Sequence, residues 1–377
     1  MKAFDIVADS RLLLLAPHPD DEALAMGGLL QRAAAAGAVV FVAFLTDGEN
    51  NPWPQRAADR RWSIGPQERA RWGARRRSEA LRSMRALGLG PERATFLGFP
   101  DQRLTRLVVD GDPALTRALR ELLDEREPTH VVSPSAQDHH PDHSAIAVAV
   151  RATLAGSRGH AAVRLFEYVV HDRSQRPAGA VVRVRLGHDE IARKRRAIAC
   201  HASQLIFRRR ELLAYAMPGE TFHEIAAPGA DEPHHPIPGI EVSGDRLLIR
   251  LRRRPCARAF GPVTLQLLFP ALTGLRRVMS VALPWRSGTV PLRFADGRAY
   301  PHVAEYRGGP YRGVLGVPVA PLPRLVPLRE ARIPLRVLRR GRLAHPAGVE
   351  RARLAPRAGE RATRSARRSR AWLRPRP

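Results

Sequence analysis

The sequence predicts an α/β protein, in which a parallel sheet with helices on both faces precedes a small β-rich module. Through the first two-thirds of the 377 residues, short apolar runs of strand length alternate with longer stretches of helical periodicity. Strands that alternate with helices form parallel sheets covered on both faces, as in Rossmann-like folds. After about residue 240, short alternating segments separated by Pro and Gly follow, a pattern typical of an antiparallel sheet.

The expected strands are short runs rich in Leu, Val and Phe, namely Leu12–Ala16, Val39–Leu45, Thr95–Phe99, His130–Ser133 and Val163–Val170. The expected helices are Glu22–Ala36, Gln67–Leu87, Pro113–Arg126 and Pro141–Leu154. Gly37 and Gly88 follow the first two helices, as terminating glycines do, and proline opens the last two. In such sheets ligands bind beyond the carboxyl ends of the strands. We therefore expect the functional residues there.

Changes in composition divide the chain into four parts. Residues 1–225 carry the α/β pattern, residues 226–239 form a linker rich in Pro, Gly, Ala and His, and residues 240–350 are a β-rich accessory region. Residues 351–377 hold ten arginines and one acid, with few large apolar side chains. Such a tail cannot bury enough apolar surface to fold, so we expect it to be disordered.

Composition excludes several classes of protein. Two cysteines rule out a disulfide framework and a metal site built from several thiolates. No apolar run approaches the ~20 residues of a membrane-spanning helix, and we expect a soluble cytoplasmic protein. The net charge of +27 comes almost entirely from arginine and suits a polyanion as partner.

A cluster of polar residues follows the first expected strand. Its sequence, Pro17-His18-Pro19-Asp20-Asp21-Glu22, places one imidazole and three carboxylates within five residues. His18 and Asp21, three residues apart across a turn, can both reach one cation, which leaves Asp20 free as a base. Imidazole and carboxylate together suit Zn²⁺ or another first-row metal. A helix cap would explain one acid but not the whole cluster.

A second cluster, Asp138-His139-His140-Pro141-Asp142-His143, follows the fourth expected strand. Because the carboxyl ends of parallel strands share one edge of the sheet, we expect the two clusters to meet. Two histidines, one carboxylate and a water are the ligands of catalytic zinc, whereas a closed structural site normally uses cysteines. The sequence therefore predicts a metal hydrolase.

These motifs resemble the PIG-L (LmbE-like) zinc-dependent N-deacetylases, which remove acetyl groups from N-acetylglucosamine-containing molecules. The resemblance covers about residues 10–224. The first cluster matches the family's (A/P)HPDDE motif and His140-Pro141-Asp142-His143 matches its HPDH motif. Further matches are Thr46-Asp47-Gly48-Glu49, Arg76 with Glu79, Phe96-Leu97-Gly98-Phe99-Pro100-Asp101, and Lys194, Ala197, His201, Ser203 and Gln204.

The resemblance implies a role for each matched residue. It implies that one Zn²⁺ per chain, or another first-row divalent ion, is held by His18, Asp21 and His143. It makes Asp20 the general base and His140 the acid or the oxyanion-stabilising group, and we expect a protonated His140. It also implies a sugar pocket lined by Glu49, Arg76 and Asp101. The segment Asn50–Trp72, with three tryptophans among arginines, is longer and more basic than the family pattern, so the substrate stays open.

We therefore expect a zinc-dependent N-deacetylase whose substrate is an N-acetylglucosamine-type amino sugar or its conjugate. One alternative is a polyanion- or nucleic-acid-binding protein that uses the Arg-rich surface and tail. Another is a metal hydrolase of the same fold that acts on a different amide or an ester. We also expect weak contact between the tail and anionic polymers or membrane surfaces. A nucleotide cofactor is disfavoured because His-Pro-Asp-Asp stands where Gly-x-Gly-x-x-Gly would follow the first strand.

Overall fold

The computed structural model describes residues 2–110, 112–136, 138, 140–155, 160, 162–171, 180–225, 239–252, 263–270, 276–294, 297–318, 335–339 and 342–344. They belong to two units. The first comprises Met1–Val108, Ala114–Ala226 and Gly341–Leu343, and the second comprises Val109–Pro113, Ala227–Arg340 and Ala344–Pro377. The expected tail, and the expected linker as far as residue 238, lie outside the described residues.

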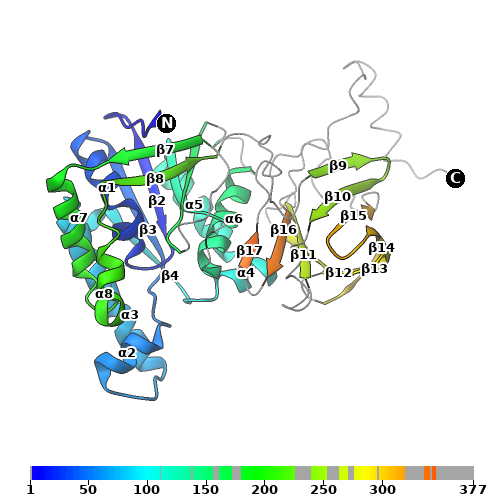
Figure 1. The fold of residues 1–377 in the computed structure, drawn as a ribbon, viewed down its shortest axis with the longest axis horizontal. Coiled ribbons are helices and arrows are strands. Elements are labelled where there is room, and N and C mark those ends of the chain that lie inside the picture. The colour runs from blue at the N-terminus through cyan, green and yellow to red at the C-terminus, as the bar shows by residue number, and fades with distance from the viewer. Residues whose placement is uncertain are drawn as a thin grey trace. The chain divides into compact units, whose positions relative to one another are not determined.

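An eight-stranded sheet forms the centre of the first unit, in the order β1-β7-β8-β6-β5-β2-β3-β4 (Figure 1). Its strands are β1 (Lys2–Ala3), β2 (Arg11–Ala16), β3 (Val39–Thr46), β4 (Ala94–Phe99), β5 (His130–Pro134), β6 (Arg164–Tyr168), β7 (Ala180–Arg185) and β8 (Gly219–Glu224). The neighbours β6, β5, β2, β3 and β4 run parallel. Strand β8 runs antiparallel between β6 and β7. The expected α/β class with a mainly parallel sheet is confirmed.

Helices flank this sheet, and two groups of them pack together: α1 with α3 and α7, and α5 with α6. The helices are α1 (Asp21–Ala35), α2 (Pro52–Asp59), α3 (Pro66–Ala86), α4 (Leu104–Asp110), α5 (Ala114–Arg126), α6 (Pro141–Ala155), α7 (His188–Cys200) and α8 (Leu205–Leu213), with a 3₁₀ turn at Pro91–Arg93. None of the helices in the described part of the chain has the length and apolar character needed to cross a bilayer. The cytoplasmic location stays a prediction.

The run Leu12–Leu15 in β2 shows why the sheet is covered on both sides. Successive side chains of a strand point to opposite faces, yet all four leucines are at most 1% exposed. Leu12 and Leu14 pack in a core that includes Met26 and Leu29 of α1. Burial of one such side chain stabilises the fold by about 1.5–3 kcal/mol. The apolar run that predicted this strand is therefore also what fixes it at the centre of the sheet.

A nine-stranded sheet follows in the order β17-β16-β11-β12-β13-β14-β15-β10-β9, and its strands from β16 to β9 belong to the second unit and pair antiparallel. Its strands are β9 (Gly239–Ser243), β10 (Arg246–Arg252), β11 (Val263–Pro270), β12 (Arg276–Leu283), β13 (Gly288–Phe294), β14 (Ala299–Gly308), β15 (Arg312–Pro318), β16 (Leu335–Arg339) and β17 (Arg342–Ala344). Leu247, Ile249 and Leu251 alternate along β10 and enter the core of this unit. The expected antiparallel module is confirmed.

Candidate active site

The polar residues of the candidate site follow the carboxyl ends of parallel strands in the first unit. His18, Asp20 and Asp21 follow β2, and Asp101 follows β4. Asp138 and His140 lie between β5 and α6, and His143 is in the first turn of α6. Since these strands are parallel, their carboxyl ends lie along one edge of the sheet. A pocket of about 370 Å³ there is lined by His18, Asp20, Asp21, Arg76, Asp101, His140 and His171, among others.

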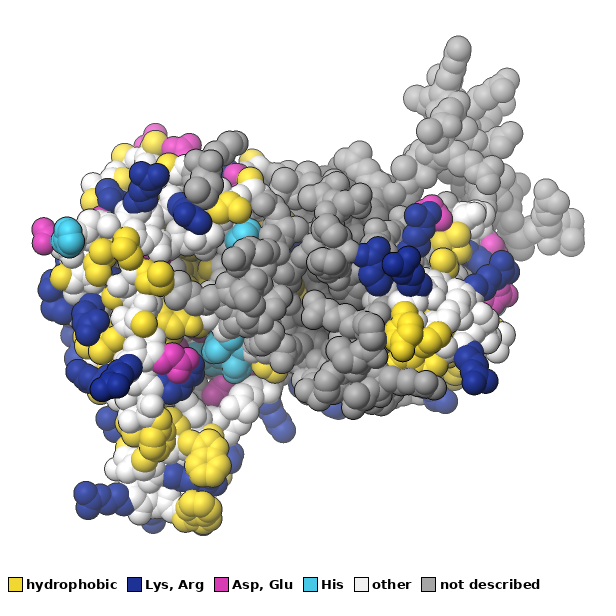
Figure 2. Space-filling view, viewed as in Figure 1, with side chains coloured by type: hydrophobic (Ala, Val, Ile, Leu, Met, Phe, Trp, Pro, Cys, Tyr) yellow, Lys and Arg dark blue, Asp and Glu magenta, His cyan; other side chains and the backbone are white. Residues whose placement is uncertain are grey.

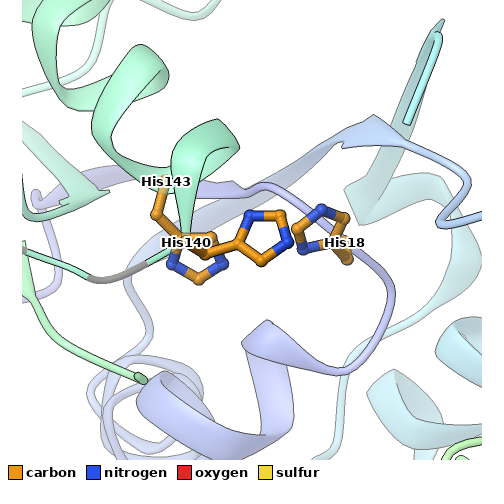
Figure 3. Close-up of side chains that lie close together, drawn as sticks. All are labelled: His18, His140 and His143. Carbon is orange, nitrogen blue, oxygen red and sulfur yellow. The ribbon is translucent and has the colours of Figure 1, made fainter. Parts of the chain in front are cut away.

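The three expected metal ligands lie together and are buried. Oδ2 of Asp21 lies 3.4 Å from Nδ1 of His18 and 3.3 Å from Nε2 of His143. The same oxygen accepts the backbone N–H of His18 at 3.0 Å, which fixes the turn after β2. Ring nitrogens of His18, His140 and His143 lie within 4.8 Å of one another, and Figure 3 shows the three rings close together at the start of α6.

Buried nitrogen atoms without a hydrogen bond indicate that this group of residues fits a cation. Within the described residues, Nε2 of His18 and both ring nitrogens of His143 make no hydrogen bond. Carboxylate oxygens lie 3.2–3.6 Å from these nitrogens, but not in hydrogen-bonding geometry. A buried polar atom without a partner is destabilising, and a bound cation would supply the partner. Imidazole and carboxylate are donors that zinc prefers.

The surrounding carboxylates also hold positive charge at this place. Burial lowers the pKa of His18, but Asp101 and the neighbouring carboxylates outweigh burial and raise it well above its usual value. Burial likewise opposes the charged form of His143, whereas Asp138 and Asp21 raise its pKa to about 10. The carboxylates that favour the charged form of both rings would equally favour a divalent cation at this place.

Asp138 connects His143 to a further histidine that the sequence analysis did not single out. Its Oδ2 lies 3.3 Å from Nδ1 of His143, and its Oδ1 lies 3.1 Å from Nδ1 of His171. It also accepts the backbone N–H of Val170 at 2.7 Å. His171 comes three residues after β6, at the same edge of the sheet. Its position after the fifth expected strand was a signal that could have identified it.

Asp20 has a backbone conformation that is rare outside glycine, with φ at 137°. Its Oδ2 lies 3.2 Å from Nη2 of Arg76, and its backbone N–H donates to Glu22 at 2.9 Å. Burial raises the pKa of the Asp20 carboxyl, and the positive charge of Arg76 opposes that increase. The carboxylate faces the pocket next to His18 and His140. This arrangement suits a group that accepts a proton.

His140 lines the pocket, and its surroundings disfavour the protonated ring. Burial, followed by the positive charges of His18, His143 and His171, lowers its pKa to about 2. Its Nδ1 accepts the backbone N–H of Asp142 at 3.2 Å, which places the proton of the neutral ring on Nε2. The lowered pKa favours a neutral ring that donates a hydrogen bond from Nε2, and the role of His140 as acid or oxyanion-stabilising group stays a prediction.

Two of the three expected sugar-binding residues line the pocket. Arg76 donates from Nη1 to the carbonyl of Gly48 at 2.8 Å and from Nη2 to the carbonyl of Pro19 at 2.6 Å. Asp101 also lines the pocket, whereas Glu49 accepts the backbone N–H of Asp101 at 2.9 Å and is not a lining residue. Gly48 has φ at 62°, and a Cβ there would overlap Nη1 of Arg76, so glycine is required.

Comparison with known proteins finds a match to the family model PIG-L, described as GlcNAc-PI de-N-acetylase, over residues 13–154. A 1D-myo-inositol 2-acetamido-2-deoxy-alpha-D-glucopyranoside deacetylase of Nocardia farcinica is 33% identical over 153 residues, which are 36% of this chain and 49% of the relative. The enzyme of the same name from Mycobacterium tuberculosis is 33% identical over 150 residues, 35% of this chain and 47% of the relative. The chain thus spans about half the length of the curated relatives it matches.

Two solved structures are also similar. A conserved protein of Thermus thermophilus has 27% identity and a TM-score of 0.43, over 62% of this chain and 97% of that one. An N,N'-diacetylchitobiose deacetylase of Pyrococcus horikoshii has 21% identity and a TM-score of 0.44, over 56% of this chain and 82% of that one. Likenesses at this level say nothing about activity. The family model covers both clusters of candidate ligands, and the family inferred from the motifs is confirmed. Residues 13–154 of this chain form a domain of the PIG-L family.

Proposed function

We propose that this chain is a zinc-dependent N-deacetylase that hydrolyses the acetamide of an N-acetylglucosamine-type amino sugar or its conjugate. The observation that carries the proposal is that His143 and His18 both lie beside Asp21, which lines the pocket, with ring nitrogens that lack hydrogen bonds among the described residues. The match to the PIG-L model and the activity named for the curated relatives support the same reaction.

The residues present fit a zinc ion, with His18, Asp21 and His143 as its protein ligands. Two imidazoles and one carboxylate leave a coordination position open, as a catalytic site requires. When bound, such an ion supplies Lewis acidity, which polarises a carbonyl group and makes water more acidic. Asp138 accepts a hydrogen bond from Nδ1 of His171 when that ring carries its proton there, and its other carboxylate oxygen lies 3.3 Å from Nδ1 of His143, so its negative charge faces the His143 ring.

In this proposal Asp20 is the general base. It lies in the pocket beside His18, and its side chain is not needed as a ligand because Asp21 faces His18 and His143. Asp20 accepts a proton from the water that attacks the acetamide carbonyl, and the raised pKa of its carboxyl favours this transfer. The protonated carboxyl is then available to return the proton to the leaving amine.

His140 stabilises the negative charge that develops on the carbonyl oxygen. Neutral imidazole with its proton on Nε2 donates a hydrogen bond without becoming charged. Fixed donors that point at a developing oxyanion are among the largest contributions to catalysis. Arg76 and Asp101, which line the same pocket, are positioned to meet the hydroxyl groups of a sugar. Glu49 acts behind them, through the backbone of Asp101.

The direct test is metal analysis of the purified full chain, combined with a measurement of acetate and free amine released from N-acetylglucosamine and a panel of its glycosides. We expect about one zinc per chain and equimolar release of the two products. Release of product from ester or other amide substrates alone would assign the same site a different reaction. A chain that holds zinc but releases no acetate from any amino sugar would contradict the proposal.

A further inference from the structure

The pocket has a second wall, formed by α2 and α8, that the deacetylation chemistry leaves unused. Trp53 of α2 and Phe207 of α8 line the same pocket as His18 and Asp20. Both aromatic side chains are mostly exposed, at 61% for Trp53 and 64% for Phe207. Figure 2 shows hydrophobic side chains, in yellow, gathered over the region of α2 and α8 beside acidic and histidine side chains. We call Trp53, Trp62 and Phe207 the aromatic wall.

Exposed hydrophobic side chains are concentrated on this part of the molecule. In the described ranges, eight large hydrophobic residues are exposed, and five of them lie on or next to α2 and α8: Trp53, Trp62, Ile206, Phe207 and Met217. Scattered single exposures are ordinary, whereas a concentration of them indicates a binding surface. Two of these residues, Trp53 and Phe207, also line the pocket, so a ligand of this surface would extend into the pocket.

The aromatic wall is held in place without a ligand. Asn51, just before α2, donates from Nδ2 to Oε1 of Gln204 at 3.0 Å, and Gln204 immediately precedes α8. The rings of Trp53 and Trp62 meet edge to face, with centroids 6.2 Å apart. The guanidinium of Arg56 lies 4.8 Å from the Trp53 ring and 5.0 Å from the Trp62 ring. Side chains that are already positioned by contacts within the protein lose less conformational entropy on binding.

The arginine that lines the pocket and the arginine between the two tryptophans both have partners within the protein, which favours an apolar group over an anion at the wall. Arg208, which also lines the pocket, donates from Nε to Glu211 at 2.7 Å. Arg56 donates from Nε to the carbonyl of Trp62 at 2.8 Å and packs on both tryptophan rings. Leu212 and Tyr215 extend the apolar and aromatic lining on the side of α8. Aromatic side chains therefore supply most of the recognition.

We propose that the aromatic wall binds the aglycone of the substrate, and that this aglycone is an aryl or alkyl group. This proposal rests on the function proposed above. A sugar whose acetamide lies between His18 and Asp20 extends outward along the same pocket, past Trp53 and Phe207. The preferred substrate is therefore a 2-acetamido-2-deoxy sugar with an apolar group at its anomeric carbon. The free sugar fills only the polar part of the pocket and is a poor substrate.

The test compares acetate release from free N-acetylglucosamine with release from its benzyl and octyl glycosides, in both anomers, with the full zinc-loaded chain. We expect kcat/KM to be at least tenfold higher for an apolar glycoside, mainly through KM, which corresponds to about 1.4 kcal/mol. In Trp53→Ala and Phe207→Ala the ratio of the two kcat/KM values should fall toward 1. Tyr311→Ala removes an aromatic side chain of 45% exposure from the second unit and should leave the ratio unchanged.

A second measurement tests aglycone binding at the aromatic wall independently of the proposed deacetylation. Benzyl glucoside, which has no acetamide, is titrated into the wild-type chain and Trp53→Ala while tryptophan fluorescence is followed. Saturable binding by the wild type alone supports the wall even if no acetate is released. Equal kcat/KM for free sugar and glycosides, or binding that survives in Trp53→Ala, would overturn the proposal. The proposal would also be overturned if Trp53→Ala and Phe207→Ala reduced only the sedimentation of the chain with phosphatidylglycerol vesicles, because the aromatic wall would then be a membrane contact.

Discussion

Nε2 of His201 lies 2.7 Å from Oε1 of Glu22, and both side chains are buried. The other carboxylate oxygen of Glu22 accepts the backbone N–H of Asp20. Asp20 has a positive φ, a strained conformation that persists only where neighbouring groups stabilise it. His201, which follows α7, thus helps to position Asp20, which follows β2, through Glu22.

Glu22→Ala removes the acceptor that holds the Asp20 backbone. Displacement of a catalytic group by about 1 Å can reduce the rate ~10²-fold. We expect a loss of that order in kcat, with the zinc content retained, measured by metal analysis and acetate release. Glu22→Gln keeps an oxygen that can accept the Asp20 N–H and should recover most of the loss. Equal losses in the two variants would show that the charge of Glu22, and not its role as acceptor, matters.

The ligand assignment predicts that His143→Ala loses both zinc and activity. His143 is fully buried, and Asp21 lies 3.3 Å from its Nε2, so its removal opens the metal site at its centre. The measurements are zinc content after dialysis and acetate release. His188→Ala, at an exposed histidine that begins α7, serves as the matched control and should retain both. Full zinc occupancy in His143→Ala would exclude His143 as a ligand.

Asp20→Asn distinguishes a base from a ligand. The amide has nearly the same shape as the carboxylate but cannot accept the proton, and loss of a positioned general base reduces rates by ~10²–10⁴-fold. We expect such a loss in turnover with zinc retained, checked on one preparation by acetate release and metal analysis. Activity close to that of the wild type would show that Asp20 is not the general base and serves only as the residue that caps α1.

The buried ion pair between Lys194 and Glu220 predicts an effect on stability. Nζ of Lys194 lies 2.6 Å from Glu220, and both side chains are at most 3% exposed. Removal of one partner from a buried pair costs about 3–5 kcal/mol. Lys194→Met should lower the free energy of unfolding in urea by that amount. Arg32→Met breaks a partly exposed pair with Glu190 and should cost less than about 1 kcal/mol. Equal urea concentrations at the midpoint of unfolding for Lys194→Met and Arg32→Met would contradict the prediction.

We expect the Arg-rich tail to contribute to polyanion binding but not to catalysis. Residues 351–377 carry a net charge of +9, and the proposed metal ligands and catalytic residues all precede residue 150. Truncation after Glu350 should leave kcat/KM for a small amino sugar unchanged. It should weaken retention on heparin and reduce the salt dependence of that retention, because counterion release scales with the number of cationic contacts. A tenfold rise in KM with unchanged retention would instead make the tail part of the active site.

Residues with strong local patterns could be predicted from the sequence. The apolar run of β2 and the helical periodicity of α3 need no partner to be recognised, and the structure places both within one residue of the expected bounds. That His18 and His143 lie close to each other could also be predicted from the sequence, because parallel strands bring their carboxyl ends together. The PIG-L resemblance then gave each residue an expected role.

Other features depend on contacts that no local pattern records. Strand β8 has the sequence Gly-Glu-Thr-Phe-His-Glu, with one large apolar residue, and it is a strand because β6 and β7 pair with it on both sides. Helix α2 begins with two prolines in its first turn, so its sequence resembled a loop. The lowered pKa of His140 depends on burial and on the charges of three other histidines, and its accepting nitrogen is set by a backbone N–H of the next helix.

The contact between His201 and Glu22 joins residues 179 positions apart, and the proposed metal ligands likewise come from distant parts of the chain. During synthesis, His18 and Asp21 therefore leave the ribosome well before the chain that contains His143 and His201. Sites assembled from such distant segments form late in folding, since long loops must close first. If the proposed site holds an ion, all of its ligands come together only after the first unit has folded, and the ion would stabilise that folded unit from then on.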